Sequence, residues 1–596
     1  MKKIIYLVAT AIFTLSLVSC ENFLDSNNYY SKDSSNFPMN ATDAEQMITG
    51  IYNNLNVCLE NSVQQNHFIW DNISSDDCLG GGGNDDADAQ AEDLLMYFGA
   101  DMYNDFYTDR YKGIARANAA IETLGSCGVD ESTLKQYFGE SFFLRAWFYY
   151  EIGSMFGNIP CPVRSKADAT LPQISGEALW GQIIEDCKIA ADIMPAKKAI
   201  GDGHVDKYCA EALMGRAYLF ASGFYDLDEI ALPAYKNDEI GIDIPEGTKI
   251  TKAEVGKYIK DCVDNSGYSL VDDPHNLWSY TNRCSVEHED SPYKGKGYKW
   301  CMDDGAVNPE AMFMIKFNTQ ADWGTTMGYS NFTSLYMGVR GQESNEDHFP
   351  FGKGWGMAQV SPQLVQDWKN AEPMDKRLDA SIVSVEQFNS YTFNGENNVQ
   401  ETGYYQAKIQ PITAYDEEGE CRSSFFNVMY PGMAYASGDP EDKDYNMLAD
   451  QVLIRFAEVL LMDAEINNNE NSFNAVRARA GLKPKPLTEE NIRNERRWEL
   501  CFEGVRFGDL RRYGMDYCAA ALDKQEGVPC HNMSEDVMTN NASKYNGSYG
   551  ARYKATKGFV KIPESQIALS AGAGEQYKFT QNPGWDNGSE FPGWTN

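Results

Sequence analysis

The segment from Thr488 to Gly514 constrains the fold of this 596-residue chain most, because it joins a helical pattern to a high density of charge. Its apolar residues recur at the spacing of one buried helix face: Trp498, Cys501, Phe502 and Val505. Thr488 suits the N-cap of this helix, and Glu489 and Glu490 suit the positive end of its dipole. We expect the helix to end at Gly504.

Charged residues of both signs surround these apolar positions. They are Glu495, Arg496, Arg497, Glu499, Glu503, Arg506, Asp509, Arg511 and Arg512. Carboxylates four positions apart share a helix face and repel each other unless arginines lie between them. The pattern therefore predicts a packed network of buried ion pairs, in which Glu499 and Arg511 are structural. The alternative is a glycosidase, whose acid and nucleophile would be two of the glutamates facing each other across the scissile bond.

The segment resembles the C-terminal signature of the RagB/SusD family of outer-membrane nutrient-uptake lipoproteins, in the residues ERRWELCFEGVRFGDLRRYG. Other stretches resemble family motifs in the same order: GESFFLRAWFYYEIGSMFGNIP (Gly139 to Pro160), IRFAEVLLMDAEINN (Ile454 to Asn468), VRARAGL (Val476 to Leu482), VKIPESQI (Val560 to Ile567) and QNPGW (Gln581 to Trp585). The resemblance covers essentially the whole chain beyond residue 20. It implies a mainly α fold, a tetratricopeptide-like scaffold of helix pairs with a large irregular, loop-rich insertion that contains short strands.

The first twenty residues have the pattern of an export signal. Lys2 and Lys3 precede a short, mostly apolar run that is too brief to span a membrane, so residues 1–19 are expected to be removed. The run ends in Leu-Val-Ser before Cys20, which resembles a bacterial lipobox and predicts lipidation of Cys20. An ordinary signal cleaved nearby, which would leave Cys20 a free thiol, is the alternative. The expected location is the cell surface, lipid-anchored to the outer membrane.

Composition narrows the partners and cofactors. A formal net charge of −36 argues against nucleic acid as a partner. The 14 cysteines include no C-x-x-C pair, and with only 6 histidines there is no clustered His/Cys set, so neither a metal site nor a cofactor is expected. Cys284 and Cys301, in one irregular region, are the first pair to test for a disulfide.

The mature chain is expected to form one intertwined globular unit of three regions. Residues 20–230 are mainly helical, residues 231–445 form the loop-rich insertion, and residues 446–596 hold the C-terminal helices and tail. Helices are expected at 103–124, 134–156 and 208–224, and short strands at 311–317 and 404–409. In the last of these helices, Gly215 is expected to lie where two helices touch, as in a tetratricopeptide hairpin.

The stretch from Asp71 to Asp93 is glycine-rich, acidic and without an apolar face. This composition predicts a loop, and a mobile one. Its alternating oxygen-bearing side chains could bind calcium, but the glycine of an EF-hand loop is missing, so a solvated acidic loop is the preferred interpretation.

The insertion carries aromatic residues next to glycine and asparagine. Aromatic rings on loops can stack on the CH faces of sugars, while nearby polar groups bind the hydroxyls. The predicted ligand-binding residues are Trp300, Trp323, Tyr329 and Trp355, with Asp76 of the acidic loop as a hydroxyl acceptor. Core packing is the alternative for each aromatic residue, and the helical context of Trp368 favours a core role there.

No recognisable catalytic motif is present, since a G-x-S-x-G elbow, an H-E-x-x-H helix and a Walker A loop are all absent from the sequence. The chain is therefore not expected to be an enzyme. The resemblance implies a surface protein that captures oligosaccharide and passes it to a SusC-like TonB-dependent transporter. A peptide-binding member of the family, an adhesive surface protein and a surface glycan hydrolase are the alternatives.

Overall fold

The structure is a computed structural model of the chain. It describes residues 37–60, 65–166, 170–196, 203–234, 248–317, 331–340, 344–393, 397–415, 418–422, 449–585 and 588–594. Cys20, Trp323 and Tyr329 lie outside these ranges. Within them, no helix has both the length and the apolar character that a membrane span requires.

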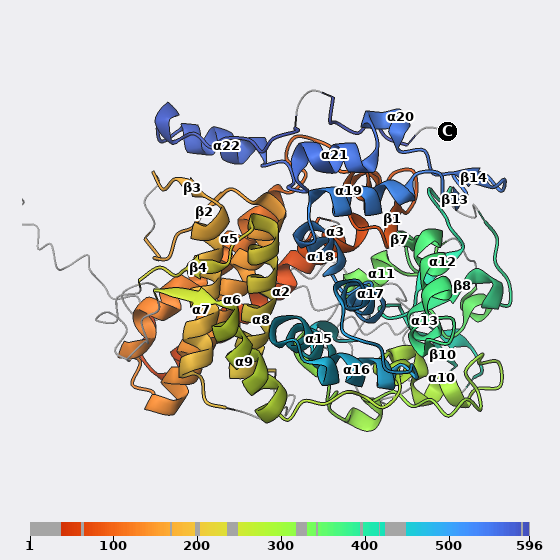
Figure 1. Cartoon of the computed structure of the whole chain (residues 1–596), viewed down its shortest axis with the longest axis horizontal. Helices are drawn as coiled ribbons and strands as arrows, with labels where there is room; N and C mark the ends of the chain where they lie inside the picture. The colour runs from red at the N-terminus through yellow and green to blue at the C-terminus, as the bar shows by residue number, and fades with distance from the viewer. Residues whose placement is uncertain are drawn as a thin grey trace, which may run out of the picture.

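A series of long helices begins on the left side of the molecule in Figure 1 and reaches its centre at α15. Its members are α2 (Ala41–Glu60), α5 (Asn104–Thr123), α6 (Glu131–Phe156), α7 (Gly176–Ile193), α8 (Lys207–Tyr225), α9 (Lys252–Asn265) and α15 (Phe456–Asn467). Each packs against the next, and α15 packs against α9 although the insertion separates them in sequence. The mainly α scaffold of helix pairs is therefore confirmed, as are the helices expected near 103–124, 134–156 and 208–224.

The remaining helices surround the insertion and the C-terminal region. They are α3 (His67–Ile73), α4 (Ala87–Asp93), α10 (Arg283–Glu287), α11 (Phe332–Tyr336), α12 (Pro362–Ala371), α13 (Lys376–Ser381), α16 (Glu470–Arg479), α17 (Glu489–Leu500), α18 (Arg506–Arg512), α19 (Met515–Leu522), α20 (Ser543–Asn546), α21 (Tyr549–Thr556) and α22 (Glu564–Ala571). Among the described residues the strands are short and pair only in twos. All pairs are antiparallel: β1 (Cys78–Gly81) with β7 (Met357–Val360), β2 (Ile159–Pro160) with β3 (Gln173–Ile174), β4 (Glu229–Ala231) with β5 (Lys249–Thr251), β6 (Ala311–Ile315) with β12 (Gln451–Arg455), β8 (Ile382–Ser384) with β9 (Tyr404–Gln406), β10 (Ala414–Tyr415) with β11 (Cys421–Arg422), and β13 (Pro529–Cys530) with β14 (Met538–Thr539). Strands β6 and β9 confirm the expected strands at 311–317 and 404–409.

Helix α6 is the central helix of the scaffold. Asp130 caps it by accepting a hydrogen bond from the backbone N–H of Thr133. Every residue from Phe138 to Phe156 is buried, as expected for a helix that is apolar on all sides. Its buried Arg145 donates two hydrogen bonds of 2.7 Å to the carboxylate of Asp186 on α7, which offsets the cost of burying both charges.

Gly215 lies at a helix contact, as the sequence predicted. A Cβ added there would come within 2.6 Å of the Ile259 side chain on α9 and 3.1 Å of the Met462 sulfur on α15. A larger residue would push these helices apart. The close approach therefore explains why glycine stands in the middle of α8 despite its low helix propensity.

The prediction of a mobile loop between Asp71 and Asp93 is wrong. This stretch holds the end of α3, strand β1 and helix α4, and most of it is buried. Two features explain the difference. Glycines allow a close approach, since a Cβ at Gly80 would lie 2.8 Å from the carbonyl oxygen of Ala89. The negative charges of Asp76 and Asp77 are paired with Arg506 and Arg497, which lie far away in the C-terminal part of the sequence.

The helix that begins at Thr488 stops four residues earlier than predicted. Thr488 caps α17 as expected, by accepting from the N–H of Asn491, but α17 ends at Leu500. Phe502 has φ +66° and Gly504 has φ +69°, so the chain turns before α18. The Asn72 side chain stabilises this turn: its Nδ2 donates to the Phe502 carbonyl, and its Oδ1 accepts from the Gly504 N–H. Tertiary contact therefore overrides the local helical pattern.

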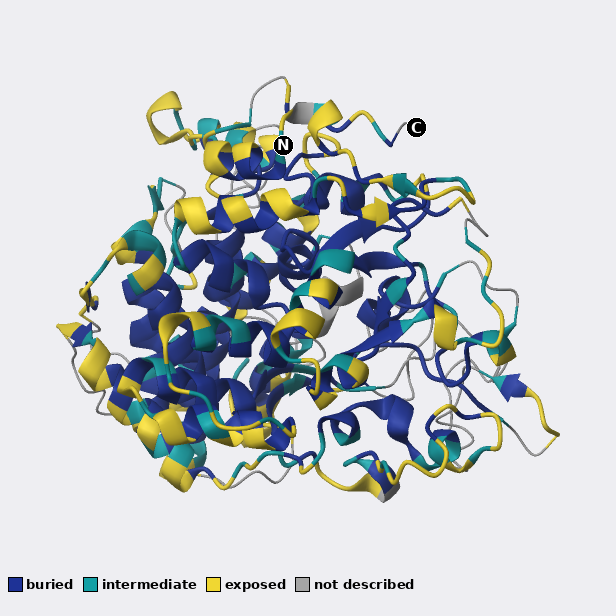
Figure 2. Cartoon of the chain, turned by 45° about the vertical axis from the view of Figure 1, so that its right-hand side comes forward, coloured by how far each residue is buried: buried dark blue, intermediate teal, exposed yellow. Residues whose placement is uncertain are grey.

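Buried residues run through the middle of the helical layer and continue into the loop-rich side (Figure 2). Trp368 on α12 is fully buried and stacks on Trp498 of α17 with ring centroids 5.0 Å apart, which confirms its predicted core role. Cys284 and Cys301 are both free thiols, so the structure does not form the disulfide considered for them. Both residues pack against the edge of the core instead.

Candidate ligand-binding site

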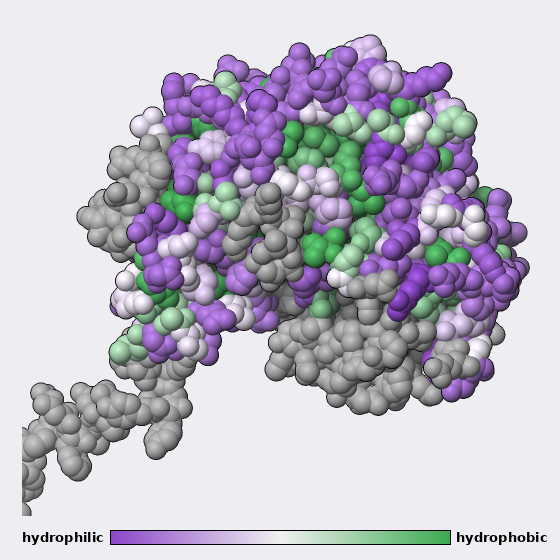
Figure 3. All heavy atoms as spheres, turned by 90° about the horizontal axis from the view of Figure 1, so that it is seen from below, coloured by the Kyte–Doolittle hydropathy of each residue, from purple (hydrophilic) through white to green (hydrophobic). Residues whose placement is uncertain are grey.

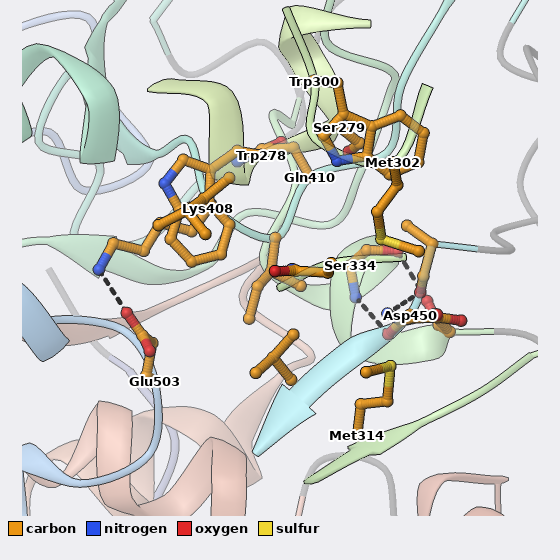
Figure 4. A pocket seen from close by; sticks show the side chains of 16 residues that line it. Trp278, Ser279, Trp300, Met302, Met314, Ser334, Lys408, Gln410, Asp450 and Glu503 are labelled. Carbon is orange, nitrogen blue, oxygen red and sulfur yellow. Dashed lines mark hydrogen bonds and ion pairs between the residues drawn. The ribbon is translucent and has the colours of Figure 1, made fainter. Parts of the chain in front are cut away.

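Trp300, one of the predicted ligand-binding residues, lines a small cavity together with Trp278 (Figure 4). The cavity holds about 40 Å³, which is room for a few water molecules and too little for a sugar ring. The Trp300 side chain is 5% exposed, and the backbone N–H of Trp300 donates to the Thr281 carbonyl. Trp300 thus occupies the kind of packed position that the core alternative described, and its stacking on a ligand stays a prediction.

Lys408 connects this cavity to the charged segment of α17. Its Nζ lies 5.2 Å from the Trp278 ring centroid and donates to Glu503 Oε1 at 2.6 Å, as Figure 4 shows. The same ammonium group donates to the Glu499 carbonyl at 2.9 Å. Burial alone would raise the pKa of Glu503, but Arg455 and Lys408 lower it below its usual value. A buried ion pair between Lys408 and Glu503 therefore fixes this wall of the cavity.

Glu499 is the centre of the predicted ion-pair network, which the structure confirms. Its carboxylate contacts three arginines from three different parts of the chain: Arg377 of α13 at 2.9 Å, Arg455 of β12 and Arg479 of α16. Burial would raise the pKa of Glu499, but Arg479, Arg455 and Arg377 together lower it well below its usual value. A carboxylate held ionised in this way cannot donate the proton that a glycosidase acid supplies.

Arg511, the other residue predicted to be part of this network, is placed differently. Its Nη1 donates to the Ser154 carbonyl at 2.7 Å, and no carboxylate forms an ion pair with it among the described residues. Aromatic rings surround its guanidinium instead, with centroids 4.6 to 5.8 Å away: Trp70, Phe220, Phe224, Phe507 and Phe559. The prediction that Arg511 is structural fits this position, but the expected ion pair was wrong.

Asp76, the predicted hydroxyl acceptor, already has strong partners. Its two carboxylate oxygens accept from Arg506 at 2.7 and 2.9 Å, and one lies 3.2 Å from Arg497. Burial would raise the pKa of Asp76, but Arg497 and Arg506 lower it. Asp76 lines an open hollow of about 450 Å³ that includes neither Trp300 nor Trp355. The structure therefore does not bring Asp76 to Trp300 or Trp355.

Trp355 lies where the acidic, glycine-rich segment meets the insertion. Strand β1 pairs with β7, and the Gly82 N–H donates to the Gly356 carbonyl at 2.9 Å. This pairing needs glycine at Gly81, which has φ +71° and where a Cβ would lie 2.4 Å from the Gly356 oxygen. The glycine run therefore places the acidic residues that follow it beside Trp355.

Arg340 joins the two sides of this junction. Its Nη1 donates to the Trp355 carbonyl at 3.1 Å and lies 3.4 Å from Asp86 Oδ2. Asp86 Oδ2 also accepts from the Gly83 N–H at 2.7 Å, and burial raises the pKa of Asp86 against the opposing effects of Gly83 and Arg340. A Cβ at Gly83 would lie 2.4 Å from Arg340 Nη2, so a larger residue there would displace the guanidinium.

The side chains at this junction have the chemistry of a sugar-binding surface. The Trp355 ring is half-buried and packs edge-on against Tyr336 of α11, with centroids 4.9 Å apart. Arg340, which donates to the Trp355 carbonyl, and its partner Asp86 are partly exposed, and Asn84 and Asp85 are exposed. We call these five residues, Asn84, Asp85, Asp86, Arg340 and Trp355, the Trp355 surface. Aromatic, guanidinium, amide and carboxylate groups together can stack on a ring and bind its hydroxyls.

Sequence reasoning proposed Trp355 and Asp76, whereas the structure places Asp86 and Arg340 next to the Trp355 backbone. The order of residues offers no signal that separates the two aspartates, since their arginine partners are hundreds of residues away. Arg340 does stand in a Gly-Val-Arg-Gly stretch between aromatic residues, which is a loop context like that of Trp355. Among the described residues, no group of three or more His, Cys, Asp and Glu side chains is arranged to hold a metal ion.

The face seen from below carries mostly hydrophilic residues, with apolar residues gathered in groups between them (Figure 3). This agrees with the high net negative charge of the chain.

Comparison with known protein families gives two matches. Residues 309–585 match the model described as the SusD family, and residues 22–219 match the model described as "Starch-binding associating with outer membrane". Among curated relatives, SusD-like protein P2 of Formosa agariphila is 22% identical over 437 residues, which are 69% of this chain and 72% of that protein. SusD-like protein P38 of the same organism is 22% identical over 556 residues, or 86% of this chain and 92% of that protein.

Solved structures share the fold over nearly the whole chain. Surface glycan-binding protein A from Bacteroides fluxus aligns with a TM-score of 0.67 at 22% identity, covering 92% of this chain and 100% of that one. A laminarin-binding SusD-like protein aligns with a TM-score of 0.64 at 22% identity, covering 92% and 100%. Surface glycan-binding protein A from Bacteroides thetaiotaomicron, in complex with laminarihexaose, aligns with a TM-score of 0.65 at 16% identity, covering 91% and 100%.

Proposed function

Because this chain belongs to the SusD family, we propose that it is a cell-surface lipoprotein that binds an oligosaccharide and passes it to a SusC-like TonB-dependent transporter. The observation that carries the binding part is the shared fold with surface glycan-binding proteins, one of them in complex with laminarihexaose. In this proposal capture occurs without hydrolysis, and the arginine-bound Glu499 does not serve as a glycosidase acid.

We place the ligand on the Trp355 surface. The Trp355 ring would stack on the apolar CH face of a sugar ring, while Arg340 donates to hydroxyl oxygens and Asp85 or Asp86 accepts from hydroxyl hydrogens. The ion pair between Arg340 and Asp86 fixes both groups before the ligand arrives, which lowers the entropic cost of binding. Trp323 and Tyr329 remain proposed contacts because they closely precede α11, the helix that carries Tyr336.

Lipidation of Cys20 supplies the anchor in this proposal, since the sequence before it resembles a lipobox. A Cys20→Ala variant should leave the membrane fraction and appear in the soluble fraction. The experiment needs cells that lack the transporter, because a protein partner could also retain the variant. If the variant stays in the membrane fraction of those cells, Cys20 is not the anchor.

The binding site is tested by titration calorimetry of the mature protein, first with laminarihexaose and then with other oligosaccharides. Stacking on an aromatic face contributes on the order of 1–2 kcal/mol, so Trp355→Ala should weaken the best ligand about tenfold or more. Tyr577→Ala is the control, because it removes an exposed aromatic residue from the C-terminal segment. Thermal melts separate lost binding from lost folding.

Two results would reject this placement. Equal affinities for the wild type and Trp355→Ala would put the ligand elsewhere, and so would a loss that tracks the melting temperature. A reducing-end assay on the same mixtures tests for hydrolysis, since a binding protein releases no new ends. Co-purification of the lipidated protein with a TonB-dependent transporter tests the transfer step.

A further inference from the structure

A second hollow, separate from the Trp355 surface, is lined mainly by residues of helices α12, α17 and α19. It is open to solvent and encloses about 450 Å³, enough for a small ligand of more than one ring. Its polar lining comes from residues far apart in sequence: Asp76, Asp367, Asn370, Asn494, Arg497, Arg506, Tyr517 and Lys524.

The charge of this lining is unusual for the molecule. Three cations, Arg497, Arg506 and Lys524, face the hollow, and only two carboxylates do, whereas the whole chain carries a formal charge of −36. Both carboxylates are already bonded to arginine: Asp76 to Arg506, and Asp367 to Arg497 at 3.0 Å. Asp77, behind the lining and 1% exposed, bonds to Arg497 at 2.7 Å and offsets it from the buried side.

Arg506 has an unused donor at this hollow. Its Nε and Nη2 donate to Asp76, but Nη1 has no hydrogen-bond partner among the described residues, although the side chain is only 5% exposed. Nη1 is not among the buried atoms without a partner in the described part of the chain, so it reaches the solvent of the hollow and can donate to a ligand there. Lys524 is exposed at the same hollow and, within the described residues, forms no ion pair.

Tyr517 adds an aromatic wall. Its side chain is 39% exposed, and the guanidinium of Arg493 lies 4.7 Å from its ring centroid, which holds the ring in place. The amide of Asn494, one residue further along α17, also lines the hollow. The hollow therefore combines two available cationic donors with an aromatic surface and amide groups.

We propose that this hollow binds the oxyanion group of a small ligand, with the guanidinium of Arg506 and the ammonium of Lys524 as its donors. A carboxylate or sulfate oxygen accepts from the free Nη1 of Arg506, and Lys524 neutralises the remaining charge. The ligand that bears this oxyanion group is an acidic sugar, whose ring lies against Tyr517. The choice of a sugar as carrier rests on the proposed function, whereas the anion site does not.

Titration calorimetry on the mature protein at constant ionic strength tests the site with three probes: sodium glucuronate, glucose and sodium sulfate. Glucuronate should bind at least about tenfold more tightly than glucose, because the carboxylate adds charge-assisted hydrogen bonds. Lys524→Gln should weaken glucuronate and sulfate several-fold, and Tyr517→Ala should weaken glucuronate alone. Lys554→Gln, which removes an exposed lysine on neighbouring α21, is the matched control and should change neither.

The outcomes separate the parts of the proposal. Sulfate binding that depends on Lys524, together with glucuronate no tighter than sulfate, supports the anion site and rejects the sugar carrier. Equal binding by the wild type and Lys524→Gln, or an equal loss in Lys554→Gln, overturns the site, since general charge would explain the result. Titration of laminarihexaose into the Trp355 variant, described above, tests the proposed function independently.

Discussion

Four buried glutamates, two beside α17 and two in the helical layer, have pKa values shifted in opposite directions. Around α17, Glu499 and Glu503 bond to arginine or lysine, and these cations lower the pKa of both groups. In the helical layer, Glu185 on α7 is fully buried and has no hydrogen-bond partner among the described residues, and burial raises its pKa to about 8. Burial also raises the pKa of Glu211 on neighbouring α8, to about 9, against the opposing effect of Lys207.

The pKa shifts differ because, within the described part of the chain, arginine side chains contact the glutamates beside α17 but not Glu185. The network at α17 draws Arg377, Arg455 and Arg479 from separate segments, so its ion pairs tie the insertion to the C-terminal helices. The scaffold helices pack mainly through apolar faces and offer Glu185 no such partner, with Lys188 only an electrostatic neighbour. The two regions therefore predict opposite responses to loss of a carboxylate and to pH.

The largest effect is expected in the network. Glu499→Ala leaves three buried arginines without a shared carboxylate, and breaking such a pair typically costs about 3–5 kcal/mol. The free energy of unfolding, from urea titration, should fall by that amount. Glu489→Ala on the same helix is the control, because Glu489 is exposed and its pair with Arg493 contributes little. A Glu499→Ala protein as stable as this control would contradict the network, and lost glycan binding at unchanged stability would move the segment into the site.

A smaller effect, of opposite sign in pH, is expected from Glu185. Its pKa is raised from 4.5 to about 8, so the folded state holds the proton more tightly than the unfolded chain. The resulting stability is fully present below about pH 4.5 and is lost as the pH rises through about 8. Glu185→Gln has no such proton to lose. Between pH 5 and pH 8 the free energy of unfolding of the wild type should therefore fall by at least about 1 kcal/mol more than that of Glu185→Gln.

Urea titrations at pH 5, 6.5 and 8 measure this change. Glu131→Gln, at an exposed position in the first turn of α6, provides the control and should show no such pH dependence. If the wild type and Glu185→Gln respond equally to pH, Glu185 is ionised in the folded state and has found a partner.

Much of the fold could be predicted from the sequence, because helical periodicity is a local signal. The 3.6-residue pattern of α5, α6 and α8 and the cap at Thr488 are read within a single turn or two of helix. The stop at Leu500 could not be predicted, because the turn after it depends on Asn72, which is more than 400 residues away in sequence. The buried state of the acidic segment likewise depends on Arg497 and Arg506.

The candidate site shows the same limit on sequence reasoning. Trp355 was predicted from residue type and loop context, and these describe a side chain without its neighbours. Which aspartate meets an aromatic residue depends on the pairing of β1 with β7, and that pairing places Asp86 at Arg340. Asp76 has the same chemistry, but it lies before β1 and contacts the α17 and α18 arginines instead.

The smallest effect is expected at Arg511, which resembles the scaffold carboxyls in being buried without an opposite charge bonded to it. Arg511→Met should lose cation–π contacts and the hydrogen bond to the Ser154 carbonyl, yet it also removes a desolvated cation and leaves no ion-paired carboxylate behind. We expect a net change of only about 1 kcal/mol in the free energy of unfolding.

Arg512→Met is the matched comparison one residue away, since Arg512 bonds to Glu465 and Asp509 and its removal leaves both without that partner. Urea titration of the two variants should therefore rank Arg512→Met as clearly more destabilising. The reverse order would show that the aromatic rings hold Arg511 more strongly than carboxylates hold its neighbour, and that bonded opposite charge does not decide the stability of buried ions in this fold.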